Sequence, residues 1–389
     1  MFVAVPPLTS LEELCRKSSI GMAELDGPGL KSASTKQVAK FTLCVLDTHG
    51  QPPPVQQHVS AELKSLVDGS VLQSAVMSQT SSKYELSYTP TTRGRHQLTI
   101  RVNNTEIGKF QVFVHHPPTQ LGTPVRVIGG MNRPIYSAVG DTQVFVTEHG
   151  ASRYTVLNMQ GQRVLTIGSK GKPPFGNGGP TGIATGDDGS VFITCNDHKL
   201  RKFDRCGDLV VSVGERGKNN QEFDCPEGVR YHNHQVYVCD IDNGRIQTFD
   251  SDLNFLRTLC NLGDGPGQLK NPTDIDFDSL GNVYVVDWGK CRVLVFSEDG
   301  KYLHQFGQEG WGKGELDHPS GLCVNGDYVY VAESRSSRVS VFHTLGQFVH
   351  SFGKRGTGRG ELKGPRGVAI DEDGFVFVCD VGNNCIQVF

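Results

Sequence analysis

One pattern of apolar and polar positions returns six times over the last two-thirds of the chain. Each copy opens with a proline, followed by about five small or apolar residues, a turn, and a run that alternates apolar and polar residues. A second and a third alternating run follow, and a glycine-rich loop ends the copy. Period-2 alternation in runs of about five residues predicts short antiparallel strands. The opening prolines are spaced by 46, 46, 46, 47 and 46 residues: Pro134, Pro180, Pro226, Pro272, Pro319 and Pro365.

Four predicted strands in about 46 residues, repeated six times, are typical of a β-propeller. Residues 124–389 are therefore predicted to form a six-bladed propeller. The sixth copy stops after its third strand, at Phe389. The run PVRVIGG (124–130) resembles the fourth strand of the other copies, so we expect it to pair with CIQVF (385–389). An N-terminal strand in the last blade would close the ring and cover its free sheet edges.

The residues before this repeat follow another pattern. Residues 1–20 are expected to be a flexible lead-in. Residues 21–115 contain some seven short strand-like runs cut by Gly and Pro, which is typical of an immunoglobulin-like β-sandwich. Residues 116–123 are predicted to be a proline-rich linker. The clearest strand-like runs are 40–46, 59–63, 71–76, 84–91, 96–102 and 109–114.

Composition narrows the function classes. The chain has 38 Lys/Arg against 41 Asp/Glu, so no field of the whole protein favours nucleic acid or a membrane. No apolar run approaches the length of a membrane span, and the N-terminus lacks the basic region of a signal peptide. The 11 cysteines are scattered, with no C-x-x-C and no Cys/His spacing typical of zinc. We expect reduced thiols, a cytoplasmic location, and no metal or cofactor.

The whole pattern resembles the C-terminal half of the TRIM-NHL family, in which a filamin-type immunoglobulin domain precedes a six-bladed NHL propeller. The filamin likeness rests on GPGL (27–30), on residues 84–102 and on the strand at 109–114. It departs at Gly108-Lys109, where that repeat usually has Gly-Ser-Pro. The NHL likeness rests in part on a P-x-G-[VIL] motif at four positions: Gly182, Gly228, Gly321 and Gly367.

A second repeated motif is an acidic residue five positions before an arginine. The acid ends the second strand of a copy and the arginine begins the third, so we predict ion pairs that hold the blades together. The second copy departs, with Cys195 and Lys199, and the sixth has Asp380 but Cys385. The predicted structural pairs are Glu148/Arg153, Asp240/Arg245, Asp287/Arg292 and Glu333/Arg338.

Catalysis is the least favoured function. Enzymatic propellers place metal ligands at the inner ends of their first strands, but the runs that follow the opening prolines (TGIAT, EGVRY, TDIDF, SGLCV and RGVAI) contain no histidine. Glycine near the axis lets the strands crowd together, which leaves no room for a metal. Asp274 and Asp276 are exceptions in a single copy. A hydrolase or lyase is a remote alternative.

Candidate partner-binding residues gather on the face that carries the loops between blades and the hairpins after the second strands. Basic residues occur in the loops into the first, second and sixth blades, and both tryptophans lie on the same face. Acidic residues gather in other loops, at Glu215, Glu222, Asp224, Glu309, Glu315 and Asp317. The predicted binding residues are Arg133, Lys170, Lys172, Lys354, Arg355, Arg359, Lys363, Arg366, Trp288 and Trp311.

These features predict a recognition module without catalytic residues of its own. The resemblance implies that the propeller binds a protein destined for ubiquitination, or an RNA hairpin for post-transcriptional repression. Residues 124–389 hold 27 Lys/Arg against 32 Asp/Glu, which with the tryptophans favours a protein, whereas the basic loops favour RNA. In that family ubiquitin-ligase activity belongs to a RING domain, which this sequence lacks. Self-association would likewise depend on parts of such a protein not present here.

Overall fold

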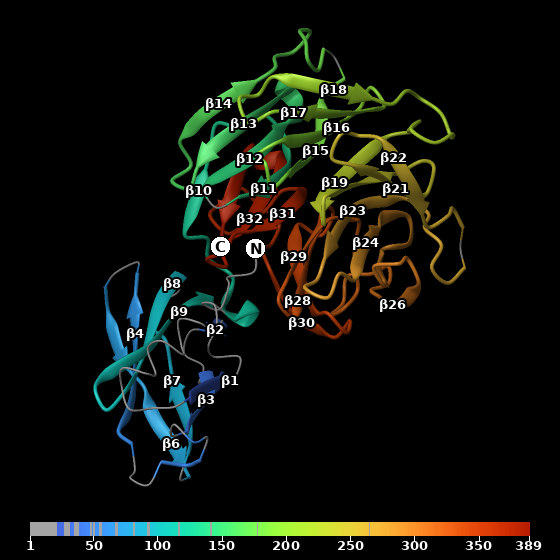
Figure 1. Cartoon of the computed structure of the whole chain (residues 1–389). Coiled ribbons are helices and arrows are strands. Elements are labelled where there is room, and N and C mark those ends of the chain that lie inside the picture. The colour runs from blue at the N-terminus through green and yellow to red at the C-terminus, as the bar shows by residue number, and fades with distance from the viewer. Residues whose placement is uncertain are drawn as a thin grey trace. The chain divides into compact units, whose positions relative to one another are not determined.

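The computed structural model describes residues 22–26, 32–34, 39–46, 49, 51–53, 57–66, 69–80, 82–91, 94–115, 117–140, 142–176, 178–263 and 265–389. The predicted lead-in (1–20) and the GPGL run (27–30) lie outside these residues. Contacts divide the chain into two compact units, Met1–Gln120 with Glu372–Phe375, and Leu121–Asp371 with Val376–Phe389. Both units are built from strands (Figure 1), so the predicted all-β fold class is confirmed.

The N-terminal unit contains two sheets, with strand orders β1-β3-β7-β6 and β2-β9-β8-β4-β5. Alternate residues of β3, among them Phe41 and Leu43, are buried together with Leu98 and Ile100 of β8. Period-2 burial on both sheets is the arrangement expected of a sandwich. The strands are β1 (Met22–Asp26), β2 (Ser32–Ser34), β3 (Ala39–Leu46), β4 (Val59–Ser65), β5 (Val71–Gln73), β6 (Ala75–Gln79), β7 (Lys83–Tyr88), β8 (Gly94–Val102) and β9 (Thr105–His115).

The strand count of this unit differs from the predicted seven, because the described residues contain nine strands. The run 71–76 is divided at Ser74: β5 pairs with β4, whereas β6 pairs with β7 in the other sheet. The alternation of apolar and polar residues continues past Ser74, where the chain passes from one sheet to the other, so the sequence pattern does not reveal the change of sheet. The short strand β2 consists of small residues and pairs in parallel with β9, and it shows no alternation of apolar residues.

The C-terminal unit contains six four-stranded sheets (Figure 1). Short 3-10 turns also occur: η2 (Pro118–Gln120) ends the main segment of the N-terminal unit, whereas η3 (His149–Ala151), η4 (Trp288–Lys290) and η5 (Val381–Asn383) lie in the C-terminal unit. The first three blades consist of β11 (Pro134–Val139), β12 (Gln143–Glu148), β13 (Arg153–Asn158) and β14 (Arg163–Ile167); β15 (Pro180–Thr185), β16 (Val191–Cys195), β17 (Lys199–Phe203) and β18 (Leu209–Val213); and β19 (Pro226–His232), β20 (Gln235–Asp240), β21 (Arg245–Asp250) and β22 (Phe255–Leu259). The last three consist of β23 (Pro272–Phe277), β24 (Val283–Asp287), β25 (Arg292–Phe296) and β26 (Tyr302–Phe306); β27 (Pro319–Asn325), β28 (Tyr328–Glu333), β29 (Arg338–His343) and β30 (Phe348–Phe352); and β31 (Pro365–Ile370), β32 (Val376–Asp380), β33 (Cys385–Val388) and β10 (Arg126–Ile128).

The ring closes as predicted. The first strands follow one another in space from β11 to β31, and β31 lies next to β11 again. The strand β10 pairs antiparallel with β33, so that Arg126, Val127 and Ile128 face Val388, Gln387 and Ile386. The closure therefore joins the N-terminal end of the propeller unit to its last strand.

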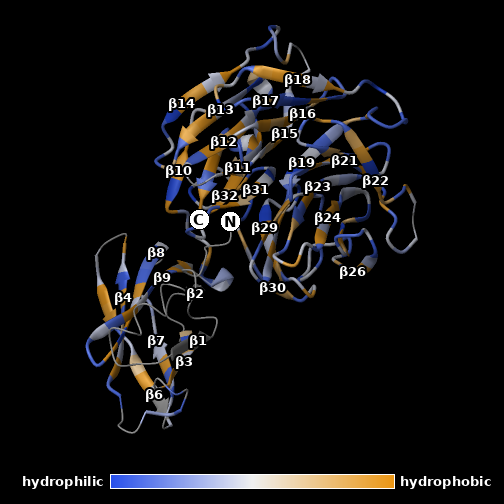
Figure 2. Cartoon of the chain, viewed as in Figure 1, coloured by the Kyte–Doolittle hydropathy of each residue, from blue (hydrophilic) through white to orange (hydrophobic). Residues whose placement is uncertain are grey.

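The hydrophobic core lies between neighbouring blades. One cluster joins Tyr154 and Val156 of the first blade to Ile183 and Phe203 of the second, and similar clusters lie between each pair of consecutive blades from the second to the sixth. Every residue of the second strands β16 and β24 is accordingly buried, and hydrophobic stretches run through strands of the propeller unit in Figure 2. A blade packed between two neighbours needs apolar residues on both faces, which explains the nearly continuous apolar runs of the second strands.

The second position after each opening proline lies at the axis of the ring. Where this residue is glycine, a side chain would collide with the next blade: a Cβ at Gly182 would lie 2.1 Å from the carbonyl oxygen of Glu227. A Cβ at Gly321 would likewise lie 2.4 Å from the carbonyl oxygen of Arg366. Glycine therefore allows the close approach of inner strands. The two other residues at this position, Tyr136 and Asp274, fill the axis instead, as described below.

Candidate recognition face of the propeller

The loops between blades and the hairpins after the second strands lie together on one face of the ring. Backbone hydrogen bonds join each hairpin to the loop that enters the same blade. The Trp288 N–H donates to the Asn271 carbonyl oxygen at 3.0 Å, and the Gly382 N–H donates to the Lys363 carbonyl oxygen at 2.8 Å. The sequence placed its candidate binding residues in these two kinds of segment, and we call this surface the recognition face.

Each acid–arginine motif forms an ion pair at the base of a hairpin. The four carboxylates are fully buried, and the guanidinium groups are partly exposed. Removing one partner would leave a charged or polar group without compensation in the interior. The nitrogen–oxygen distances are 2.9 Å in Glu148–Arg153, 2.8 Å in Asp240–Arg245, 3.1 Å in Asp287–Arg292 and 2.7 Å in Glu333–Arg338.

Hydrogen bonds determine how burial affects these carboxyl groups. Burial alone would raise the pKa of Glu148, but hydrogen bonds from Arg153, Thr155 and the Asn132 N–H lower it overall. Burial raises the pKa of Asp240, and the hydrogen bond from Arg245 only partly offsets that rise. The pairs thus share their geometry but differ in how completely the protein compensates a buried carboxylate.

The arginines also hold the loops that enter their blades. The Arg245 guanidinium donates to the carbonyl oxygens of Lys218, Asn219 and Glu222 at 2.7–2.8 Å. The Arg338 guanidinium donates to the carbonyl oxygen of Trp311 at 3.1 Å, and also to the carbonyl oxygens at positions 312 and 315. The motif spacing predicted the ion pairs but not these contacts, because they depend on how each loop folds back over its hairpin.

The departing blades replace the motif with other polar contacts. In the second blade Arg201 forms a bidentate pair with Asp197, one residue closer in sequence than in the other blades. In the sixth blade the Gln387 amide donates to the Glu361 carbonyl oxygen at 2.6 Å and to Asp380 at 3.0 Å. The predicted departures are therefore changes of residue type within a conserved plan of hairpin-to-loop contacts.

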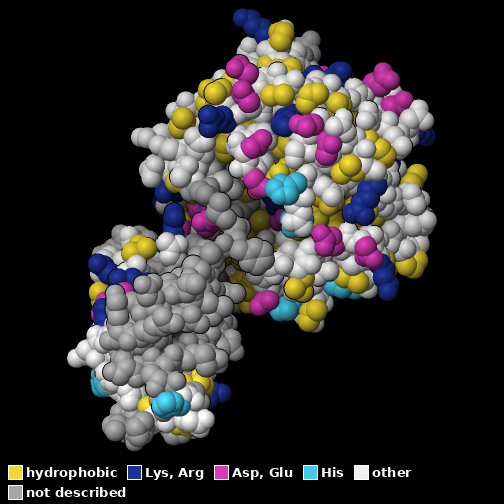
Figure 3. All heavy atoms as spheres, in the orientation of Figure 1, with side chains coloured by type: hydrophobic (Ala, Val, Ile, Leu, Met, Phe, Trp, Pro, Cys, Tyr) yellow, Lys and Arg dark blue, Asp and Glu magenta, His cyan; other side chains and the backbone are white. Residues whose placement is uncertain are grey.

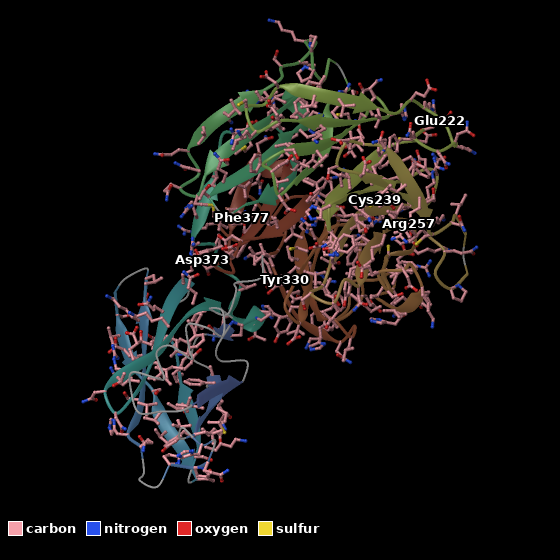
Figure 4. The ribbon with its side chains drawn as sticks, in the orientation of Figure 1. Glu222, Cys239, Arg257, Tyr330, Asp373 and Phe377 are labelled. Atoms are coloured by element: carbon pink, nitrogen blue, oxygen red, sulfur yellow. The ribbon has the colours of Figure 1, made fainter. Side chains whose placement is uncertain are left out.

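Several acidic residues of the recognition face organise the loops themselves. The Gly312 N–H donates to Glu315 at 2.8 Å, and the Asn219 N–H donates to Glu222 at 2.9 Å. Glu361 accepts the Gly358 N–H at 3.0 Å in the same way. Backbone N–H donors lower the pKa of Glu315 and Glu361, and the Asn219 side-chain amide, with its backbone N–H, lowers the pKa of Glu222. Figure 4 labels Glu222 on the loop between β18 and β19.

The basic residues predicted to bind a partner fall into two groups. Arg359 donates to the carbonyl oxygens of Pro124 and Val125 at 2.6–2.9 Å and so holds the closing strand. Lys354 pairs with Glu361 at 3.3 Å. The other group is exposed, with no side-chain partner among the described residues: Arg133, Lys170, Lys172, Arg355 and Lys363.

Arg366 lies at the axis and not among the exposed loop cations. Its guanidinium pairs with Glu227, from the opposite side of the ring, at 2.8 Å. Burial raises the pKa of Glu227, and Arg366 opposes that rise. The Tyr136 hydroxyl also crosses the axis and donates to the carbonyl oxygens of Thr273 and Ser320 at 3.1 and 3.2 Å. These side chains link opposite blades, so they fill the position where enzymatic propellers would hold a ligand.

The fourth blade contributes two more axial carboxyl groups. Asp274 accepts the N–H groups of Ile275 and Leu322 at 2.9 Å. Asp276 pairs with Arg230 of the third blade at 2.5 Å. Burial raises the pKa of Asp274 to about 7, although Arg230 and the backbone donors act against it. The two aspartates therefore bind neighbouring inner strands together.

The two tryptophans present exposed aromatic surface on the recognition face. Trp311 is 74% exposed and Trp288 is 41% exposed. The Trp288 ring lies 5.8 Å from the His318 ring in an edge-to-face arrangement. Figure 3 shows Lys and Arg side chains interspersed with Asp and Glu over the visible face of the propeller unit, so charge of one sign does not dominate there.

The ten cysteines among the described residues are all free thiols. Several are buried in the blades, including Cys239, which Figure 4 labels inside the sheet of the third blade. Burial raises the pKa of Cys239 well above its ordinary value. Asp224, Cys225 and Asp242 bring ligand atoms within 4.8 Å of one another; Cys225 and Asp242 are exposed, and the partly buried Asp224 already lies 3.3 Å from Arg216.

Comparisons with known families identify both repeats. The filamin/ABP280 repeat matches residues 17–113, and the NHL repeat matches residues 269–296 and 362–389. A search of curated proteins found no significant match. The domain content thus agrees with the resemblance drawn from the sequence. Among the described residues, no helix is long and apolar enough to cross a membrane.

Solved structures share the fold at low sequence identity. A Bacteroides thetaiotaomicron protein of unknown function is 13% identical, with a TM-score of 0.57 over 94% of this chain and 97% of its own. An auxiliary nutrient binding protein from the same organism is 14% identical, with a TM-score of 0.52 over 94% and 96%. Streptogramin B lyase is 13% identical, with a TM-score of 0.50 over 68% and 96%. At these identities the likeness extends to the fold alone.

Proposed function

We propose that the chain is a protein-recognition module whose propeller binds a partner protein on the recognition face. The observation that carries this proposal is the exposure of Trp311 on a loop held by Arg338. A large aromatic side chain presented on an ordered loop is the usual form of an interface hot spot, because it buries much apolar area at low entropic cost. Trp288 adds a second aromatic contact on the same face.

The surroundings of Trp311 support a protein partner. Arg338 fixes the backbone on which Trp311 stands, and Glu315 ties the same loop to itself through the Gly312 N–H. The loop is therefore organised before a partner arrives, which reduces the entropic cost of binding. The filled axis argues against the remote hydrolase or lyase alternative, since Arg366 and Glu227 pair there.

The resemblance to TRIM-NHL proteins extends this proposal to a biological role. The bound protein would be a substrate for ubiquitination, and the ligase chemistry would come from a RING domain outside these residues. A reducing compartment such as the cytoplasm would suit the buried free thiols. The N-terminal sandwich would connect the propeller to the rest of the assembly.

RNA-hairpin binding is the second candidate, and the exposed loop cations favour it. The two functions separate in a salt titration. Contacts to phosphates release counterions, so RNA binding weakens steeply as the salt concentration rises. A protein partner anchored on aromatic residues would show a shallow salt dependence.

The test compares Trp311→Ala with a matched control in a binding assay against partners recovered with and without RNase. The control is Leu345→Ala, because Leu345 is 67% exposed but lies in the hairpin at the other end of β29 from the recognition face. We expect Trp311→Ala to weaken partner binding by about 2 kcal/mol or more. We expect Leu345→Ala to change it little. Equal binding by both variants, or loss of the partner with RNase, would contradict the proposal.

A further inference from the structure

A groove of about 460 Å³ opens on the recognition face between the fifth and sixth blades. Three chain segments line it: the hairpin between β28 and β29, the loop between β30 and β31, and the hairpin between β32 and β33. Each segment except the last contributes basic side chains, namely Arg335 from the first and Arg355 and Lys363 from the second. No acidic and no aromatic residue is among the described residues that line the groove.

The three cations differ from other basic residues of the same segments. Arg338 and Arg359 donate to protein oxygens, and Arg366 is paired at the axis. By contrast, Arg335 and Arg355 are exposed and form no ion pair with a described residue. The positive charges of Arg335 and Arg355 are therefore available to a ligand in the groove.

Lys363 is also exposed without an ion pair to a described residue, and the position of its side-chain stem is fixed by a close neighbour. A Cβ at Gly382 would lie 2.7 Å from Cγ of Lys363, so the lysine stem passes directly over this glycine of the neighbouring hairpin. Acidic residues of the same segments are already engaged, among them Glu333, which pairs with Arg338. Glu361 is tied to Lys354 and to the Gly358 N–H, whereas the fully buried Asp380 accepts the Lys363 N–H at 2.7 Å.

We propose that this groove binds a phosphoryl group, and specifically a phosphorylated serine or threonine of a partner protein. A phosphate monoester carries about −1.5 to −2 charges at pH 7, which suits two guanidinium groups and one ammonium group around a single space. Guanidinium groups match phosphate oxygens through paired hydrogen bonds, and the lysine adds a point charge. A carboxylate would leave this concentration of positive charge mostly uncompensated.

The groove is less suited to RNA. Recognition of single-stranded RNA depends on aromatic side chains or guanidinium planes that stack on successive bases along a continuous path, whereas the two guanidinium groups here line one local space. Apart from the three cations, the lining consists of serines, glycines and Val381, and Glu309 occupies the fifth-blade loop position that corresponds to Arg355. The cations are therefore local, as a single phosphoryl group requires, and the inference names the modification that the proposed protein partner carries.

The test uses the full chain and three fluorescent probes at physiological salt. The probes are a degenerate peptide pool with a central phosphoserine, the same pool with serine, and an RNA hairpin with a mixed-sequence loop. We expect the phosphoserine pool to bind at least about tenfold more tightly than the serine pool, and inorganic phosphate to compete. Arg355→Ala and Lys363→Ala should each weaken phosphoserine binding about tenfold at an unchanged melting temperature.

The matched control is the double variant Lys218→Ala/Lys313→Ala, which removes two exposed cations from other loops of the recognition face that are not among the predicted binding residues. It should leave binding of the phosphoserine pool unchanged. Equal affinity for the two peptide pools, absence of binding to either, or preferential binding of the RNA would overturn the inference. If a partner depends on Trp311 but not on phosphorylation, the proposed function stands and only the phosphoryl site falls.

Discussion

Arg335 and Arg338 lie three residues apart in one hairpin but have opposite surroundings. The Arg338 guanidinium bonds to the buried Glu333 and to three carbonyl oxygens of the neighbouring loop. The Arg335 side chain is exposed beside the groove and makes no ion pair with a described residue. The two arginines therefore show how one face of the propeller separates the residues that hold the ring from those available to a partner.

The repeat explains this difference. The position of Arg338 is an arginine in four blades, whereas the position of Arg335 is Gly150, Asp242, Gly289 or Gly382 in others. A contact that every blade needs recurs with the period of the fold. A residue that serves one partner has no reason to recur. Charge that departs from the repeat and is exposed is thus the better guide to a binding site.

The largest expected effect comes from breaking a repeated pair. Arg338→Ala would leave the fully buried Glu333 without its cation and the Trp311 loop without its donor. We expect the free energy of unfolding of the propeller to fall by about 3–5 kcal/mol in chemical denaturation. A loss below about 1 kcal/mol would show that the pair does not hold the blade.

Asp274 is a residue at the axis that departs from the repeat, because four blades have glycine at this position, and unlike Arg335 it is buried. Its folded pKa is about 7 against an ordinary 3.8, so between these values the folded protein keeps a proton that the unfolded chain releases. This group's contribution should therefore reduce stability as pH rises through that window, by up to about 1.4 kcal/mol per pH unit. We expect Asp274→Asn to remove this slope in denaturation curves between pH 4 and 7. Parallel pH profiles of the two proteins would contradict the assignment.

Arg359 tests how the ring is closed, because this cation of the loop into the sixth blade holds the segment that leads into the closing strand β10. Arg359→Ala removes the donor to the Pro124 and Val125 carbonyl oxygens. We expect a loss of about 1–2 kcal/mol in the unfolding of the propeller. Lys354→Ala is the control, since its pair with Glu361 is largely exposed and screened by solvent, so its loss should change stability little. The reverse order of effects would assign Arg359 to the surface.

The smallest expected effect on stability is that of Arg335→Ala. An exposed side chain without an ion pair contributes little to folding, so the free energy of unfolding should change by less than about 0.5 kcal/mol. Arg338→Ala, measured beside it, provides the contrast within one hairpin. A large loss for Arg335→Ala would mean that the hairpin itself depends on this residue.

Much of the fold could be predicted because alternation and proline spacing are local signals. The blade count follows from the six evenly spaced prolines, and the pairing of β10 with β33 follows from the missing fourth strand of the last copy. The pair Asp197–Arg201 was not predicted, because a shorter turn changes its spacing from five residues to four. In the sandwich, the break at Ser74 was missed because alternation does not reveal a change of sheet.

The candidate site could be predicted only as a face. Sequence placed Arg355, Arg359 and Arg366 in one basic loop and treated them alike. Their roles diverge because Arg359 meets the closing strand and Arg366 meets a residue from the opposite side of the ring. Those distances depend on closure of the whole ring. The contribution of Arg335 was missed for the same reason, since it reaches the groove from the neighbouring blade.

The central claim is that exposed cations outside the repeat bind the partner whereas repeated arginines hold the ring. The most direct measurement is the affinity of the Arg335→Ala chain for the phosphoserine peptide pool, by fluorescence anisotropy below its unfolding transition. We predict binding about tenfold weaker than that of the unaltered chain. Unchanged affinity would contradict the claim, because the arginine that most clearly departs from the repeat would then have no part in binding.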